Sequence, residues 1–118
     1  MSNPNIVNVT TIYGKTALAA LTTVTANVIT NSSGSNTILK VDDILLTNYT
    51  SSAVGANIVV NRSATTYYLG GNVSIPANST LVLIAKDSSI YLEEGDVIQA
   101  NVTANTSVSF VASYEQIG

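Results

Sequence analysis

An alternation of apolar and polar residues near the C-terminus constrains the fold more than any other feature of the sequence. A period of two sends one set of side chains to a core and the other to solvent or to a neighbour. The Ala104-Asn105 pair suits a tight turn, because Asn tolerates the left-handed conformation. We therefore expect a β-hairpin whose one apolar face needs a second sheet to cover it. The apolar set is Ile98, Ala100, Val102 and Ala104 before the turn, and Val108, Phe110, Ala112 and Tyr114 after it.

Short runs of β-branched residues recur along the rest of the chain, with turn signals between them. This spacing is typical of an antiparallel sandwich. Residues 16–30 are ambiguous, but their density of Thr and Val favours two short strands or one bent strand over a helix. The other expected strands cover residues 6–13, 37–48, 56–61, 65–69, 72–75, 81–85 and 90–92. The expected turns and loops are Gly14-Lys15, 31–36, 49–55, Gly70-Gly71, 76–78 and 93–96.

Two of these strands carry a more specific prediction. In residues 37–48 the apolar parity changes at Asp42-Asp43, and a β-bulge there would put Leu39, Val41, Ile44 and Leu46 on the same face. Residues 81–85 (LVLIA) are continuously apolar, which predicts a central strand that is buried on both faces.

The sequence thus predicts an all-β fold, an antiparallel β-sandwich of jelly-roll type with eight or nine strands. Residues 14–118 form its single domain, and residues 1–13 an N-terminal arm or edge strand. The expected core consists of Leu39, Val41, Ile44, Leu46, Ile58, Val60, Val73, Ile75, Leu81, Leu83, Ile98, Val102, Val108 and Phe110.

The composition excludes several classes of function. The chain has no Cys and no His, so disulfides, zinc sites with Cys or His ligands and Ser-His-Asp triads are ruled out. Its four basic residues are scattered, which argues against a nucleic-acid partner. No signal peptide is visible and no apolar window is long enough for a membrane span, so no membrane partner is expected.

Candidate catalytic and metal sites are weak. Gly14-Lys15-Thr16 ends like a phosphate-binding loop, but Val9 stands where that loop needs its first glycine. The acidic pair Asp42-Asp43 and the cluster in residues 93–96 match no calcium-loop spacing, so solvated turns are the better interpretation. We expect no enzymatic activity, no metal and no cofactor.

Two segments are candidates for contact with partners. Residues 1–13 have no evident apolar partner of their own, and extended arms add strands to a neighbouring sheet edge. In the Tyr67-Tyr68 pair one ring has to point outward, because adjacent side chains of a strand take opposite faces. The residues expected at an interface are Ile6, Val7, Val9, Ile12, Tyr13, Tyr67 and Tyr68.

Two long segments carry a family resemblance, NIVNVTTIYGKTALAALTT and SIPANSTLVLIAKDSSIYLEEGDVIQANVTANTSVSFVASYEQI. Their GKTA turn, Pro-Ala-X-Ser turn, LEEGD turn and Ser-Tyr-Glu ending resemble small virion structural proteins of tailed phages, especially marine phages of cyanobacteria. The shorter pattern L-x-x-G-D-x-I in residues 92–98 is similar to trimeric jelly rolls of the tumour-necrosis-factor and complement type.

The phage resemblance implies a non-enzymatic virion protein that assembles in the host cytoplasm. Its partners would be other virion proteins and copies of itself, with a trimer as one arrangement. The first reading is a capsid decoration or cement protein. A neck, tail or fibre-associated structural protein is the second, and a carbohydrate- or receptor-binding module that stacks glycans on Tyr67 and Tyr68 is the third.

Overall fold

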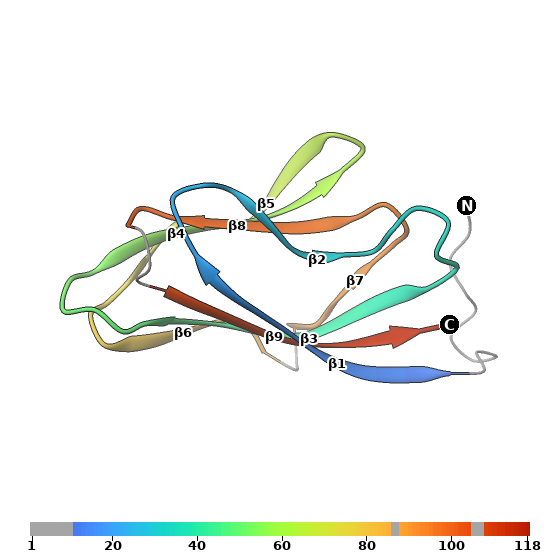
Figure 1. Ribbon diagram of the computed structural model, residues 1–118, viewed down its shortest axis with the longest axis horizontal. Helices are drawn as coiled ribbons and strands as arrows, with labels where there is room; N and C mark the ends of the chain where they lie inside the picture. Colours follow the sequence, from blue (N-terminus) through green and yellow to red (C-terminus); the bar gives the residue numbers. More distant parts are fainter. Residues whose placement is uncertain (1–10, 86–87, 105–107) are drawn as a thin grey trace.

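The computed structural model describes residues 11–85, 88–104 and 108–118, and these residues form two stacked antiparallel sheets (Figure 1). Sheet A has the order β1-β9-β3-β6, with β7 paired to β3, and sheet B has the order β2-β8-β4-β5. The expected β-sandwich is therefore confirmed. The strands are β1 (Ile12–Leu21), β2 (Ala26–Thr30), β3 (Ile38–Asn48), β4 (Val54–Arg62), β5 (Thr65–Ile75), β6 (Ser79–Ile84), β7 (Ile90–Leu92), β8 (Val97–Val102) and β9 (Val108–Ile117).

The strand order is that of a jelly roll. The first described strand pairs with the last, β2 pairs with β8, and β3 lies between β9 and β6. Except for β5 and the short β7, each strand lies in the opposite sheet from the strand that precedes it in the chain. This winding of an antiparallel chain pair around one core defines the jelly-roll architecture.

The expected C-terminal hairpin is wrong in its pairing. Strands β8 and β9 alternate as predicted, but β8 pairs with β2 and β4 in sheet B, whereas β9 pairs with β1 and β3 in sheet A. Their apolar faces meet across the core instead of lying side by side. A period of two defines which face is apolar and leaves the pairing partner open. Asn105 of the expected turn lies outside the described residues.

The β-bulge expected at Asp42-Asp43 is confirmed. The register of β3 against β9 shifts between Val41 and Asp43, and the apolar residues on both sides of the shift are buried. The carboxylate of Asp43 accepts a hydrogen bond from the Ser113 backbone N–H at 3.2 Å. The bulge thus keeps one apolar face over the whole length of β3.

The hairpin predicted at Gly70-Gly71 is wrong, because β5 continues through both glycines. The turn lies earlier, at Ser63-Ala64, where both residues have positive φ (52° and 63°), as a two-residue hairpin turn of type I′ requires. Gly70 is instead a tightly packed position. A Cβ on it would come within 3.0 Å of Leu83 Cδ1. The register of β4 against β5 shifts twice beside these glycines.

Two further predictions are overturned by strand pairing. Gly14 and Lys15 form no turn, because both pair with β9 in a continuous β1, opposite Glu115 and Tyr114. Residues 81–85 are no central strand either. Strand β6 lies at the edge of sheet A, and Val82 is 55% exposed. In both places sheet pairing overrides what local composition favours.

The core lies between the sheets and is centred on Phe110, which is completely buried. Four of the predicted core residues, Val60, Val73, Leu81 and Leu83, are only partly buried. Packing of the two inward faces is thus the main source of stability, since each buried aliphatic side chain contributes about 1.5–3 kcal/mol. The predicted core residues that are buried are Leu39, Val41, Ile44, Leu46, Ile58, Ile75, Ile98, Val102, Val108 and Phe110.

Candidate functional site

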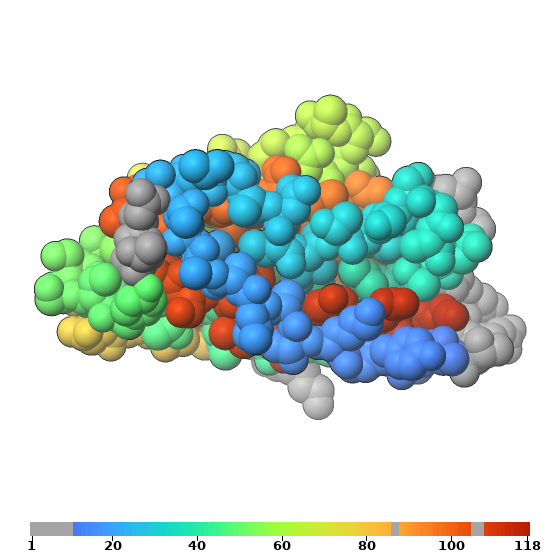
Figure 2. All heavy atoms as spheres, in the orientation of Figure 1, coloured from blue at the N-terminus to red at the C-terminus, as the bar shows by residue number. Residues whose placement is uncertain are grey.

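Of the residues predicted at an interface, those that the structure describes lie in two separate places. Ile6, Val7 and Val9 lie outside the described residues. Ile12 and Tyr13 are exposed at the start of β1, in sheet A. Tyr67 and Tyr68 lie on β5 at the far edge of sheet B, in the hairpin whose tip projects from the body of the molecule (Figure 2).

The Tyr67 and Tyr68 side chains are 58% and 67% exposed, and they border different hollows. Tyr67 borders a hollow of about 290 Å³ between the β4–β5 hairpin and β7, together with Ile90, Tyr91 and the Arg62–Asp96 pair. Tyr68 borders a second hollow on the outer face of sheet B. The expectation that one ring points outward therefore understates the exposure of the pair.

The acidic turn in residues 93–96 is part of the scaffold. Asp96 is 1% exposed and accepts two hydrogen bonds from Arg62, from Nε at 2.7 Å and from Nη2 at 2.6 Å, and one from the Glu93 N–H at 2.9 Å. Burial by itself would raise the pKa of Asp96, but these hydrogen bonds and the charge of Arg62 lower it. Hydrogen bonding to Asp96 in turn raises the pKa of Arg62.

The loop in residues 31–37 is fastened to the same turn. Glu94, which is 4% exposed, accepts hydrogen bonds from the backbone N–H groups of Gly34 and Asn36 at 2.9 and 3.1 Å. The buried amide of Asn31 donates to the backbone oxygens of Thr37 and Leu92. These carboxylates and amides hold two loops together, which accounts for their burial without a ligand.

The outer face of sheet A carries a row of apolar side chains across all four of its long strands. Leu18, Val111, Leu45 and Val82 are successive register partners on β1, β9, β3 and β6. Leu18 is 73% exposed, and none of the four packs against the core. We call these four residues the apolar row. On one side it is flanked by Ala20, Ser109, Thr47 and Thr80.

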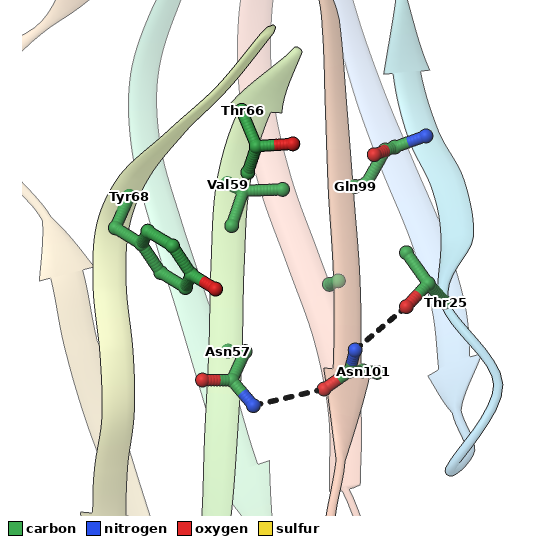
Figure 3. Close-up of a pocket in the computed structure, with 8 residues that line it drawn as sticks. Thr25, Asn57, Val59, Thr66, Tyr68, Gln99 and Asn101 are labelled. Carbon is green, nitrogen blue, oxygen red and sulfur yellow. Dashed lines mark hydrogen bonds between the residues drawn. The ribbon is translucent and has the colours of Figure 1, made fainter. Parts of the chain in front are cut away.

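The outer face of sheet B is polar instead and carries a hollow of about 290 Å³. Figure 3 shows the side chains that line it. Three of these side chains are joined in a chain of hydrogen bonds. Asn57 Nδ2 donates to Asn101 Oδ1 at 3.1 Å, and Asn101 Nδ2 donates to Thr25 Oγ1 at 2.7 Å (Figure 3). We call this site the amide hollow. Its polar lining consists of Thr25, Asn57, Thr66, Tyr68, Gln99 and Asn101.

Neither surface is predicted from the sequence, although each leaves a signal in it. The alternation of β8 places Gln99 and Asn101 on its outward parity, but nothing in the sequence indicates that Asn57 of β4 lies beside them. Val111 interrupts an outward set that otherwise consists of Ser109 and Ser113. A row across a sheet becomes visible only when the register between strands is known.

Comparisons with known proteins give no family for this chain. No family model matches it, and a search of curated proteins finds no relative. Within the described residues, no helix is long and apolar enough to cross a membrane.

Proposed function

We propose that this chain is a non-enzymatic structural protein of a phage particle, and that it acts as a decoration protein that bridges neighbouring subunits of the head. The observation that carries the proposal is the apolar row on the outer face of sheet A. A decoration protein needs a face whose free energy falls when it leaves water and docks on a partner. Exposed Leu and Val side chains form such a face. The phage resemblance of residues 5–23 and 74–117 supports the same assignment.

The size of this face suits a stable contact. Strands β1, β9 and β3 have 10, 10 and 11 residues and the edge strand β6 has 6. With strands about 4.8 Å apart and a rise of roughly 3.3 Å per residue, the face spans at most roughly 20 by 30 Å. That flat area of roughly 600 Å² approaches the roughly 800 Å² per partner of a standard interface. Flanking Ser and Thr hydroxyls provide hydrogen bonds at the rim without the desolvation cost of charges.

Localisation and copy number in intact particles test the proposal. We expect cryo-electron microscopy to place the chain on the head, with on the order of hundreds of copies, as symmetric shells require. A copy number equal to a small multiple of three or six would contradict the head assignment and favour a neck, tail or fibre location.

A surface variant tests the docking face itself. Leu18→Ser with Val82→Ser should reduce incorporation into particles, because both side chains are exposed and belong to the apolar row. Tyr68→Ser is the matched control, since Tyr68 is about as exposed but lies on sheet B. The docking face is wrong if the double variant fills particles to the level of the unmodified chain.

A further inference from the structure

We infer that the amide hollow on sheet B binds a neutral sugar residue of a glycan. This site lies on the opposite sheet from the apolar row and goes beyond the structural role proposed above. A glycan bound there would face away from the surface that docks on the particle. The inference rests on four features of the hollow.

The first feature is a set of oriented amides. Besides the chain from Asn57 to Thr25, Gln99 Nε2 donates to Asn27 Oδ1 at 2.8 Å, and Asn57 Oδ1 accepts from the Asn72 N–H at 2.7 Å. These bonds fix the amides before any ligand arrives, which lowers the entropic cost of binding. An amide group offers a donor pair and an acceptor, a pattern that matches neighbouring hydroxyls of a sugar ring.

The second feature is unused hydrogen-bonding capacity. Within the described part of the chain, Asn57 and Gln99 each donate a single side-chain N–H to another side chain. The hydroxyl groups of Thr66 and Tyr68 make no hydrogen bond to another described residue. In Figure 3 the Tyr68 hydroxyl points across the hollow, on the side of Asn57 and Val59. A polyhydroxylated ligand would satisfy these groups together.

The third feature is an aromatic wall. The Tyr68 ring lies against Gly71, where a Cβ would come within 3.3 Å of Tyr68 Cδ2. The register shift between Ile58 and Val59 places Tyr68 opposite Val59, in line with Gln99 and Asn27 across the sheet. Bulges re-aim side chains beside sites in this way. The ring offers an apolar surface to the C–H face of a sugar.

The fourth feature is the absence of charge among the lining residues of the hollow. A phosphate or carboxylate ligand would lose its hydration there and gain no cation in return. The volume, about 290 Å³, lies just below the usual range for ligand pockets, roughly 300–1,000 Å³. The site therefore favours one neutral ring of a longer chain over an anionic glycan or a nucleic acid.

Nuclear magnetic resonance titration of the purified chain tests the inference. The probes are the neutral trisaccharides maltotriose, cellotriose, mannotriose and tri-N-acetylchitotriose, with an oligogalacturonate as the anionic probe. We expect at least one neutral probe to shift the side-chain amide signals of Asn57, Gln99 and Asn101. The inference is overturned if no neutral probe shifts them at millimolar concentration, or if only the anionic probe does.

Adjacent tyrosines provide a matched pair of variants. Tyr68→Ala should weaken the binding by about tenfold, the scale expected for one lost hydrogen bond and its apolar contact. Tyr67→Ala should leave it unchanged, since Tyr67 borders the other hollow. Thr66→Val, which keeps the shape and removes one hydroxyl, should weaken it less. Equal losses in Tyr67→Ala and Tyr68→Ala would overturn the assignment of the site.

Discussion

Phe110 is the only Phe in the sequence, and its side chain is completely buried between the sheets. Truncation of such a side chain costs about 3–5 kcal/mol, through lost burial and the cavity left behind. Phe110→Ala should therefore remove a large share of a stability of about 5–15 kcal/mol. Val111→Ala, on the outward parity of the same strand, should cost much less in a monomer. Chemical denaturation compares the two, and equal losses would contradict the observed faces of β9.

Asp96 should make stability depend on acid. The pKa of Asp96 is lower in the folded chain than in the unfolded chain, where it is near 4. Its contribution to the free energy of unfolding is therefore complete above the unfolded pKa and is lost as the pH falls through the folded pKa. Asp96→Asn should cost about 1.5–3 kcal/mol at pH 7, the scale of hydrogen bonds to a charged group.

Urea denaturation of both chains at pH 7 and at pH 2 measures this effect. The difference in unfolding free energy should shrink at the lower pH, because the unfolded chain takes up a proton at Asp96 more readily than the folded chain does. A difference that stays constant with pH would show that the ionised form of Asp96 is unimportant.

At the scale of elements, the β4–β5 turn can be improved. Ala64 has φ of 63°, a conformation that costs an L-residue energy and glycine none. Ala64→Gly should therefore raise the unfolding free energy by about 0.5–1 kcal/mol, net of glycine's greater freedom when unfolded. Ala77→Gly in the turn before β6 is the control, because Ala77 has no positive φ and should lose stability. Thermal denaturation distinguishes the two, and a loss in both would contradict the turn type.

The sequence predicts those elements whose cause is local. The bulge in β3 follows from a change of parity within one strand, and the loop in residues 31–36 from its Ser, Asn and Gly content. The Ser63-Ala64 turn gives no such signal, since neither residue favours positive φ. The partners of β8 and β9 could not be predicted, because an alternating strand fits beside any neighbour that covers its apolar face.

The candidate surfaces depend on residues that lie even further apart in the sequence. The sequence predicts Tyr68 at an interface, and the structure places it at the amide hollow. The other contributors come from strands far apart in the chain, such as Thr25 and Asn101. Each is an ordinary polar residue of a strand surface, and only the register of sheet B brings them together.

For the whole molecule, the N-terminal arm remains a prediction. Removal of residues 1–10 should leave the sandwich folded, because the β1–β9 ladder starts at Ile12, which pairs with Ile117. The truncated chain should nevertheless enter particles less efficiently, since an arm that adds a strand to a neighbour contributes to docking. Circular dichroism and quantification of particles measure the two effects. Normal incorporation of a folded, truncated chain would argue against the arm.

The position of β9 also has a consequence for synthesis. It follows all other described strands in the chain, yet it lies in the middle of sheet A and brings Phe110 into the core. While the ribosome is still translating residues 108–117, β1 has no strand to pair with and one edge of β3 stays open. Contacts between such distant segments form slowly, and chains held in that state expose apolar surface. Folding should therefore follow translation, and a chain that stops before β9 should be cleared by proteases instead of entering an assembly.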